Sequence, residues 1–276
     1  MTFVSAGGQA GAHRSFERCF VAMKKLLSLV LLCTVPLASC AEMVYRADVG
    51  AMFPVAKGQI ALQNSSGSLI LHDNQQDLES NMGLGDNEVS PYVHLQADTE
   101  RNRFRLHGFL SNTEGNGTLA GAYGDIPAGS PVTTSLDFYA VQATYAFQVF
   151  RERNWRLAFG GTLGAYGLDL EARTPSARES VETSIIVPMP YVEGELFFGP
   201  VIIGGDAAIM AGDFGDGNGR YGDVEAYIKL RPENALFELM AGYRYVLLDA
   251  YGTASSRDFD ADVDFRGFFF GGGVRF

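Results

Sequence analysis

The feature that most constrains this chain is a set of short segments in which apolar and polar side chains alternate. In FELMAGYRYVLL (237–248), Phe, Leu, Ala, Tyr, Tyr and Leu occupy every second position, and Glu, Met, Gly and Arg lie among those between. Successive side chains of a β-strand point to opposite faces, so one face of this segment is apolar and the other carries charge. Such a strand needs an apolar environment on one side and polar partners on the other.

Ten segments of this kind predict an all-β fold. They cover 44–53, 89–99, 103–113, 133–149, 154–170, 181–197, 200–213, 221–231, 236–250 and 260–276. The pattern is typical of an antiparallel up-and-down transmembrane β-barrel, here with ten strands and with eight or twelve as alternatives. The stretch GSLILHD (67–73) is a further strand, a loop hairpin or a piece folded into the lumen.

The connections between these segments are alternately short and long. The short ones, at 99–103, 150–155, 198–201 and 230–236, predict tight periplasmic turns that hold Arg101, Arg103, Arg151, Arg153 and Arg231. The long ones, at 54–88, 114–132, 171–183, 213–222 and 251–261, are rich in Gly, Ser, Asn, Asp and Pro and predict solvated outer loops.

The N-terminal region has the order of a secretory signal peptide. Two lysines follow Met23, and then come an apolar run and small residues, so Met23 is the expected true start. Residues 1–41 are therefore an N-terminal extension plus signal peptide, and 42–276 form a single barrel domain. LASC (37–40) resembles a lipoprotein cleavage site that would leave Cys40 lipidated; ordinary cleavage before Glu42 is the alternative.

Charge excludes one class of partner. The chain has 32 acidic and 21 Lys or Arg residues, a formal net charge of −11, whereas nucleic-acid binding needs clustered basic residues. The segments DFGDGNGRYGD (213–223) and DFDADVDF (258–265) have loose oxygen-ligand spacing, which makes divalent cations candidate partners of the acidic loops. No defined metal site and no cofactor are expected.

The chain ends on GFFFGGGVRF (267–276), where we expect Phe268, Phe270, Val274 and Phe276 to face outward. This ending resembles the C-terminal strand of bacterial outer-membrane β-barrels, which the barrel assembly machinery recognises. The mature chain, from YRADVGAMF through QQDLESNMGLGD to the end, is similar to a group of small proteobacterial barrel proteins without an established activity. The resemblance implies an outer-membrane location among outer-membrane lipids and lipopolysaccharide.

The inward faces of the predicted strands carry a nearly balanced set of charges. They are Arg46, Asp48, Asp98, Arg105, Arg156, Glu193, Glu195, Asp206, Glu225, Lys229, Glu238, Arg244 and Arg275. Isolated buried charges are costly, so we expect ion pairs across a filled lumen; a charged, selective water path is the alternative. The turn at 101–102 predicts that Asp98 pairs with Arg105 and Gln96 with His107. Glu193 and Asp206 are expected to face each other with a basic neighbour.

These observations favour a non-enzymatic envelope barrel, either structural or a narrow passive pore with acidic surface loops. The alternative is an outer-membrane barrel enzyme acting on lipid A or peptides. Its candidate general bases are the lumen pair His94 and His107, and its rim candidate is His72 with Asp73 in the first long loop. Strand alternation separates His107 from Ser111, the nearest hydroxyl on the same face, and we predict no catalytic residues.

Overall fold

The computed structural model describes residues 43–276, apart from 86–87, 215–216, 233–234 and 255. The predictions for the signal peptide, for Met23 and for Cys40 lie outside the described residues. No α-helix in the described part of the chain is long and apolar enough to cross a bilayer.

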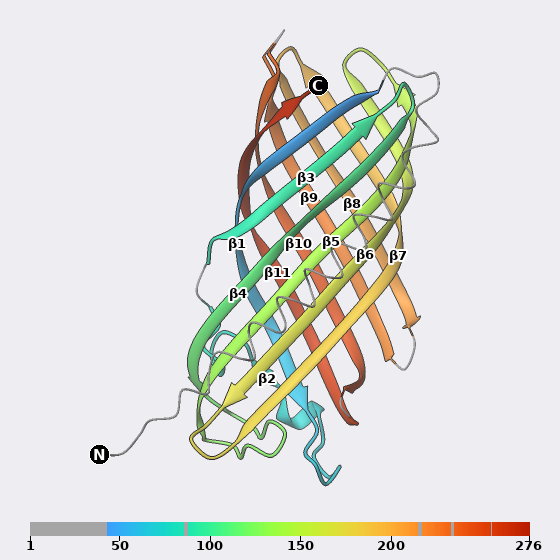
Figure 1. Ribbon diagram of the computed structural model, residues 1–276. Helices are drawn as coiled ribbons and strands as arrows, with labels where there is room; N and C mark the ends of the chain where they lie inside the picture. The colour runs from blue at the N-terminus through green and yellow to red at the C-terminus, as the bar shows by residue number, and fades with distance from the viewer. Residues whose placement is uncertain (1–42, 86–87, 215–216, 233–234, 255) are drawn as a thin grey trace, which may run out of the picture. The chain divides into compact units, whose positions relative to one another are not determined.

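Ten long antiparallel strands in this part of the chain form a closed ring, and one short strand adds to it (Figure 1). Each long strand pairs with the next in the sequence, and β11 pairs with β1. The strands are β1 (Val44–Leu62), β2 (Gln76–Asp77), β3 (Ser90–Asp98), β4 (Asn102–Thr118), β5 (Pro131–Arg151), β6 (Trp155–Arg173), β7 (Arg178–Phe198), β8 (Val201–Phe214), β9 (Gly217–Leu230), β10 (Phe237–Ala254) and β11 (Arg257–Arg275). The short strand β2 pairs with β1 only, and a single 3₁₀ turn, η2 (His72–Asn74), precedes it. The expectation of an all-β, up-and-down barrel is confirmed.

The ring closes along the whole length of its first and last strands. Pairing runs from Arg46 opposite Arg275 to Leu62 opposite Phe259. At the chain end, the Tyr45 amide donates to the Phe276 carbonyl over 2.9 Å, the Phe276 amide donates to the Tyr45 carbonyl over 3.1 Å, and the two rings stack. Unpaired backbone in hydrocarbon costs several kcal/mol, so the terminal aromatic residue completes the seam.

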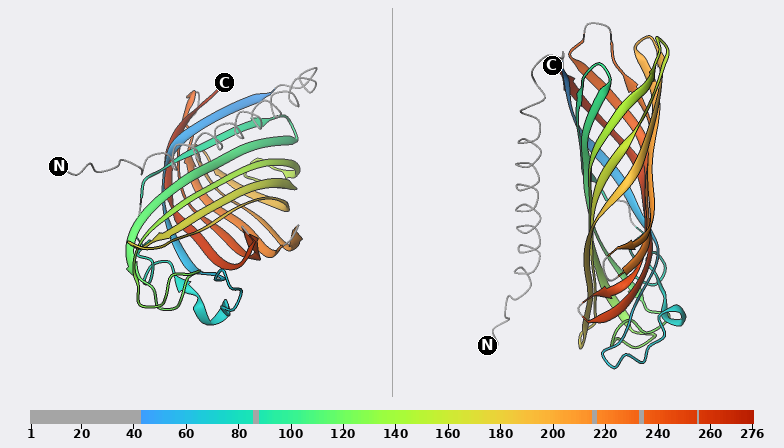
Figure 2. Two further views of the ribbon diagram at one scale, coloured as in Figure 1. Left: turned by 60° about the horizontal axis from the view of Figure 1, so that its bottom comes forward. Right: turned by 90° about the vertical axis from the view of Figure 1, so that its right-hand side faces the viewer.

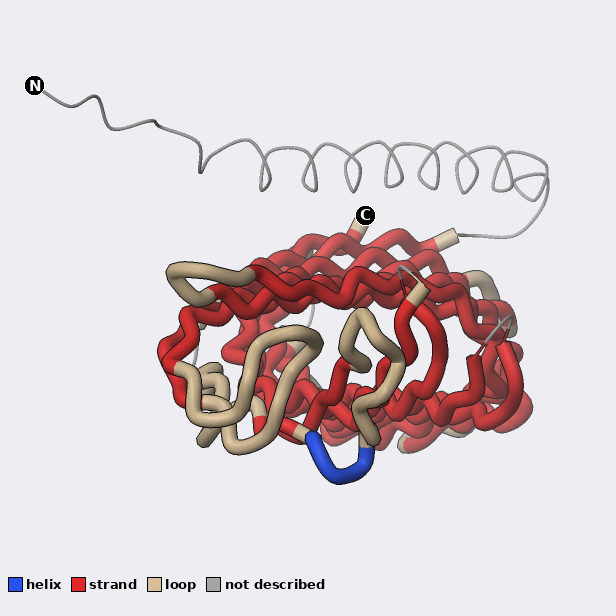
Figure 3. The backbone as a smooth tube through the Cα atoms, turned by 90° about the horizontal axis from the view of Figure 1, so that it is seen from below, coloured by secondary structure: helices blue, strands red, loops and turns tan. Residues whose placement is uncertain are grey.

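The two ends of the ring differ. We call the end with the connections 99–101, 152–154, 199–200 and 231–236 the turn end, which is at the top of Figure 1, together with the C-terminus. The opposite end, the loop end, carries 63–89 and 119–130 (Figures 1 and 2). Viewed from the loop end, the ring is oblong and these segments extend across its mouth (Figure 3). GSLILHD (67–73) therefore lies in a loop at this end and is not a further strand.

An apolar band surrounds the turn-side part of the ring. Its exposed members include Tyr45, Val49, Val93, Leu95, Tyr145, Phe147, Phe159, Leu163, Val192, Leu196, Ile203, Val224, Ile228, Leu239, Phe268, Phe270, Val274 and Phe276. On β5, β6 and β7 the band stops at a row of outward carboxylates, in which Asp169 lies opposite both Asp137 and Glu182. Because ionised groups are costly in hydrocarbon, this row marks the boundary of the lipid-facing surface on these strands.

Beyond that boundary the strands continue with their faces exchanged. In β11, Phe259, Ala261, Val263 and Phe265 are buried inside, and the aspartates between them face out. From Phe268 onward the exposed aromatic residues face out, and Phe269, Gly271 and Gly273 line the interior. Water surrounds the loop-side half, so that half places its apolar face inside, as an ordinary soluble sheet does.

This exchange explains why three of the five predicted long loops were wrong and the other two were predicted too long. The ranges 171–183, 213–222 and 251–261 are mainly strand, and β1 and β4 extend to Leu62 and Thr118, into the first two predicted loops. Polar residues on the outer face resemble a loop in the sequence, although polar and apolar side chains still alternate there, with the apolar ones now inside. A transmembrane strand needs about 9–11 residues, so the rest of each long strand extends beyond the lipid boundary.

Replacing Phe276 by Ser should weaken ring closure. The variant loses the ring stacking on Tyr45 and the apolar anchor of the last strand, so we expect less of the heat-modifiable, folded form in detergent gels. Phe198→Ser is the matched control, because Phe198 is also an exposed aromatic residue at the turn end but lies away from the pairing of β1 with β11. Equal folded fractions for the two variants would contradict the closing role of Phe276.

Candidate functional site: the filled lumen

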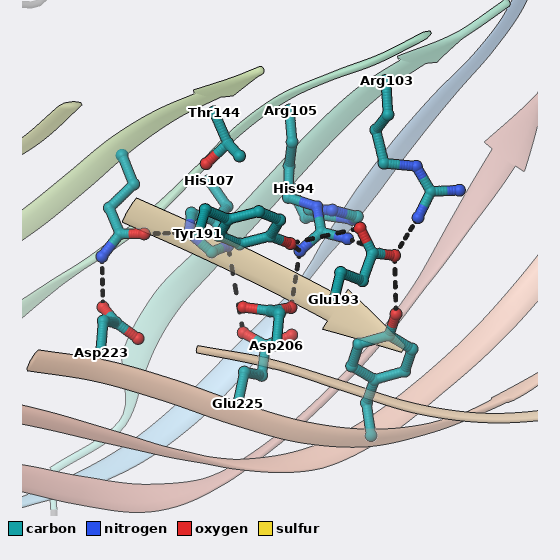
Figure 4. Close-up of polar contacts among 12 residues, drawn as sticks. His94, Arg103, Arg105, His107, Thr144, Tyr191, Glu193, Asp206, Asp223 and Glu225 are labelled. Atoms are coloured by element: carbon teal, nitrogen blue, oxygen red, sulfur yellow. Dashed lines mark hydrogen bonds and ion pairs between the residues drawn. The ribbon is translucent and has the colours of Figure 1, made fainter. Parts of the chain in front are cut away.

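The turn-side half of the lumen is filled by an ion-pair layer. Eleven of the thirteen predicted lumen charges are buried, and Arg156 and Arg275 are half-buried on the inner face. At the centre, Arg105 of β4 approaches Asp206 (Nη1 to Oδ2, 2.6 Å) and Glu193 (Nη2 to Oε1, 3.1 Å), and it donates to the Tyr191 hydroxyl over 2.7 Å. Figure 4 shows these side chains meeting from opposite walls.

Glu193 and Asp206 lie opposite each other on β7 and β8, as the sequence register predicts. The basic neighbour expected for them is Arg105, which pairs with both. Glu193 also pairs with Arg103 of β4. Two facing carboxylates inside a narrow barrel are therefore neutralised by guanidinium groups from the opposite wall.

The remaining lumen charges form further pairs around this centre. Arg46 pairs with Asp98 over 3.0 Å, Arg156 with Glu195, Arg231 with Glu238 over 2.7 Å, and Arg244 with Asp223 over 2.7 Å. Glu225 accepts a hydrogen bond from the Tyr92 hydroxyl. The Lys229 ammonium lies 4.4 Å from the centre of the Tyr227 ring. The layer thus holds its charges in contacts with one another and with aromatic residues.

Both predicted pairings across the turn between β3 and β4 were wrong. Asp98 lies opposite Arg103, Gln96 opposite Arg105, and His94 opposite His107. The turn is 99–101, stabilised by the Thr99 hydroxyl, which accepts a hydrogen bond from the Asn102 amide over 3.0 Å. The prediction placed this turn at 101–102, which shifted every pair by two residues.

Arg103 was also misplaced, in a short turn, and Asp223 was missing from the predicted lumen charges. Both side chains are inside the lumen, with 1% and 2% of their surface exposed. Arg103 donates to Asp98 over 2.8 Å. The signal for both was present, because each continues the inward series of its strand: 103, 105 and 107 in β4, and 223, 225 and 227 in β9.

The two lumen histidines belong to the same buried network. Their ring centres are 6.1 Å apart, and 2.8 Å separates His94 Nδ1 from Asp48 Oδ2. His107 Nε2 lies 2.9 Å from the Gln142 side-chain oxygen, and the Gln142 amide donates to Asp223 over 2.6 Å. Both histidines are almost fully buried. Through Gln142, His107 is connected to the Arg244–Asp223 pair.

The rim candidates are arranged differently. His72 and Asp73 are exposed on the outer turn η2, and among the described residues neither side chain forms a hydrogen bond or an ion pair. The described residues also contain no group of three His, Cys, Asp or Glu side chains placed to hold a metal ion. The two acidic segments proposed for cations are largely strand, in β8, β9 and β11.

Aromatic side chains lie next to the ion-pair layer, toward the loop end. The Tyr92 and Phe269 rings stack with centres 4.8 Å apart, and Phe138 stacks on Phe265. The Arg244 guanidinium lies 5.1 Å from the centre of the Phe109 ring, so one cation contacts both layers. This aromatic layer separates the charged interior from the apolar interior beyond it.

The loop-end half of the lumen is an apolar core that two connecting segments complete. Leu78, Met82 and Leu84 come from 63–89, and Leu119, Tyr123 and Ile126 from the β4–β5 connection; all are almost fully buried. We call these two connecting segments the seal. Gly115 and Gly117 leave room for it, because a Cβ at Gly115 would lie 2.1 Å from the Gly83 carbonyl oxygen and a Cβ at Gly117 would lie 2.0 Å from the Asn81 carbonyl oxygen. The segment around Gly83 therefore lies directly against β4.

Hydrogen bonds hold the seal in place. The Leu78 amide donates to the Gly58 carbonyl of β1, and the Gly124 amide donates to the Leu62 carbonyl. Gln76 connects the two segments, because its side-chain oxygen accepts a hydrogen bond from the Ala120 amide over 2.9 Å. These hydrogen bonds hold the apolar seal in place at the loop end.

Comparison with solved structures places this geometry in a class. The outer membrane protease OmpT of Escherichia coli is similar, with a TM-score of 0.58 and 9% identity over 84% of this chain and 97% of that chain. The neisserial surface protein NspA matches with a TM-score of 0.34 and 12% identity over 86% of this chain and 100% of that chain. The fold is that of bacterial outer-membrane β-barrels. No protein-family model matches the sequence, and no curated protein sequence matches it.

Removing Arg105 alone should destabilise the barrel more than removing it together with an acidic partner. Arg105→Gln leaves Glu193 and Asp206 facing each other, which we expect to lower the free energy of unfolding by about 3 kcal/mol. Adding Asp206→Asn should restore part of that loss. Urea unfolding followed by fluorescence of the single tryptophan measures both. Additive effects, with a coupling below about 0.5 kcal/mol, would contradict the pairing.

Acid should loosen the seal through Asp77, outside the membrane-facing strands. Its carboxylate accepts hydrogen bonds from the Ser80 amide (2.7 Å), the Ser80 hydroxyl and the Glu79 amide. The Ser80 amide contributes most to lowering the pKa of Asp77 below its usual value. The folded pKa is the lower one, so this stabilisation is complete above the unfolded pKa, about 3.9, and is lost as pH falls through the folded pKa.

We therefore expect protease cleavage within 63–89 to increase as the pH is lowered below about 4. Asp77→Asn keeps an acceptor oxygen but has no charge to lose, so its cleavage should change less over the same range. An acid-stable protease, applied to protein in detergent, makes the comparison. Identical pH profiles for the two proteins would rule out this role of Asp77.

Proposed function

We propose that this protein is a non-conducting, non-enzymatic β-barrel of the bacterial outer membrane with a structural role in the envelope. The turn end faces the periplasm, and the extended strands with their sealed loop end face outward. The C-terminal strand ending at Phe276 is the element for the barrel assembly machinery, and the apolar band contacts outer-membrane lipids and lipopolysaccharide.

One observation carries the proposal: two different kinds of packing fill the lumen in series. Ion pairs centred on Arg105 occupy the turn-side half, and the apolar core around Leu78 and Met82 occupies the loop-side half. A water path needs a continuous polar lining, whereas the apolar core offers none at the outer mouth. This arrangement supports the structural alternative over the narrow pore.

The arrangement of the histidines supports a non-enzymatic role. A general base must reach the proton it abstracts. His94 and His107 lie within the charged layer, beneath the aromatic residues and the apolar seal. His72 is accessible, but it has no acidic partner among the described residues. Among the described residues, no accessible histidine is held by a second group.

Planar-bilayer recording of refolded protein tests the proposal. We expect no unit conductance from preparations whose heat-modifiable migration shows folded barrel, because the seal closes the outer mouth. Arg244→Glu is the diagnostic variant, since Arg244 is fully buried in the lumen. Reproducible conductance steps whose ion selectivity changes in Arg244→Glu would show a charged path and would overturn the proposal.

A further inference from the structure

The ring has one incomplete seam, between β7 and β8. β7 pairs with β6 along its whole length, from Leu196 to Arg178, but it pairs with β8 only from Phe198 to Tyr191. Among the residues that the structure describes, none pairs with 178–190 of β7 on its β8 edge. β8 continues past its last pair at Ala208 and remains paired with β9. The two strands therefore separate toward the loop end, at the right-hand side of Figure 1.

Two prolines explain why pairing stops there. The Phe197 amide donates toward β6, to the Asn154 carbonyl, so odd-numbered residues of β7 direct their amides to β6 and even-numbered residues direct theirs to β8. Beyond the Tyr191–Ala208 pair, the next two donors needed by β8 are residues 190 and 188. Both are proline, which has no N–H. The sequence itself ends this ladder.

The outward side chains along the unpaired edge change character in order. Near the last pair they are apolar: Pro190, Pro188 and the exposed Ile186, with Ile209 across the split on β8. Toward the loop end follow Ser184, Glu182 and Ser180, and then Arg178, whose side chain is largely exposed and also pairs with Glu171 of β6. The apolar part lies on the lipid side of the carboxylate row that includes Glu182. The polar part lies at and beyond that row.

We propose that the split between β7 and β8 is a binding site for one lipid A molecule of lipopolysaccharide. An acyl chain lies between Ile186, Pro188 and Pro190 on one side and Ile209 on the other, and the head group lies along the polar part of β7. Arg178 meets a phosphate there. The choice of lipid A rests on the proposed function, which places the loop end in the outer leaflet.

Other occupants fit this edge less well. An added peptide strand would find no ladder donor at Pro190 or Pro188, the two positions directly beyond the last β7–β8 pair. A second copy of the chain, docked by the same edge, would bring two Glu182 carboxylates together at the membrane boundary, where repulsion is weakly screened. A lipid chain needs no donors from the edge, because its contacts are apolar.

Two matched double variants test the site. Ile186→Ser with Ile209→Ser makes the apolar part polar. Ile203→Ser with Ile228→Ser makes the same change on the paired wall, where these two residues face each other. Ile209 and Ile228 are equally exposed, at 55% and 54%. Lipid A retained per protein, after extraction of the full chain in mild detergent, is counted by mass spectrometry.

We expect wild type and the Ile203→Ser, Ile228→Ser control to retain about one lipid A per protein. The Ile186→Ser, Ile209→Ser variant should retain about tenfold less. Retention of none by wild type, equal loss in the two variants, or retention of phospholipid in place of lipid A would overturn the proposal. Membrane fractionation and bilayer conductance of the same preparations test the proposed function separately. Outer-membrane, non-conducting protein without lipid A would contradict only this inference.

A second comparison uses the prolines. Pro188→Thr with Pro190→Thr supplies both missing donors, so β7 and β8 should pair further and exclude the lipid. Amide exchange in 209–211 should then slow and lipid A retention should fall together. Slower exchange with unchanged retention would show that the lipid binds elsewhere and would overturn the assignment.

Discussion

The structure depends on the requirement that backbone groups facing hydrocarbon be hydrogen-bonded within the chain. A sheet satisfies it only by closing, and this sheet closes along β1 and β11 up to the last residue, Phe276. Closure fixes which side chains face inward, because alternation leaves no choice once the register is set. The charged residues inside the lumen are thus a consequence of placing apolar residues against lipid.

Once enclosed, those charges must neutralise one another. The interior of an oblong ring of this size is narrow enough for Arg105 on β4 to reach Asp206 on β8. Removing Arg105 would leave Asp206 without its basic partner and Glu193 with one fewer, so the layer acts as a unit. Beyond the lipid boundary the outer face does not need to be apolar, since water contacts it, and the inner face does not need to carry the charges. There the chain fills the same space with Leu78, Met82 and the inner face of β11.

How much of this could be read from the sequence depends on the environment of each segment. The alternation of apolar and polar side chains was sufficient to predict a strand and its faces where one face contacts lipid, as in 237–248. It also identified the closing strand from Phe268 to Phe276. It failed at 251–259, which the prediction assigned to a loop although β10 extends to Ala254 and β11 begins at Arg257. A reading that expects outward apolar residues ends the strand there, although the periodicity is unbroken. The register of β3 with β4 needed the Thr99 turn, whose side-chain hydrogen bond is a property of the fold. The seal could not be predicted either, because Gly115 and Gly117 gain their role only when Gly83 lies against them.

The prolines of β7 are a case in which the sequence itself determines where strand pairing ends. Proline at one such position could be a neutral substitution on a strand edge, but Pro188 and Pro190 point their nitrogens to the same neighbour and leave β6 pairing intact. Backbone hydrogen bonds between neighbouring strands stabilise the barrel, so the two donors missing between β7 and β8 lower its stability. The position is also specific, since it coincides with the change of the outer face from apolar to polar. A closed and filled interior leaves the outer surface of the barrel as its means of contact with other molecules, and this seam is where that surface departs from a continuous wall.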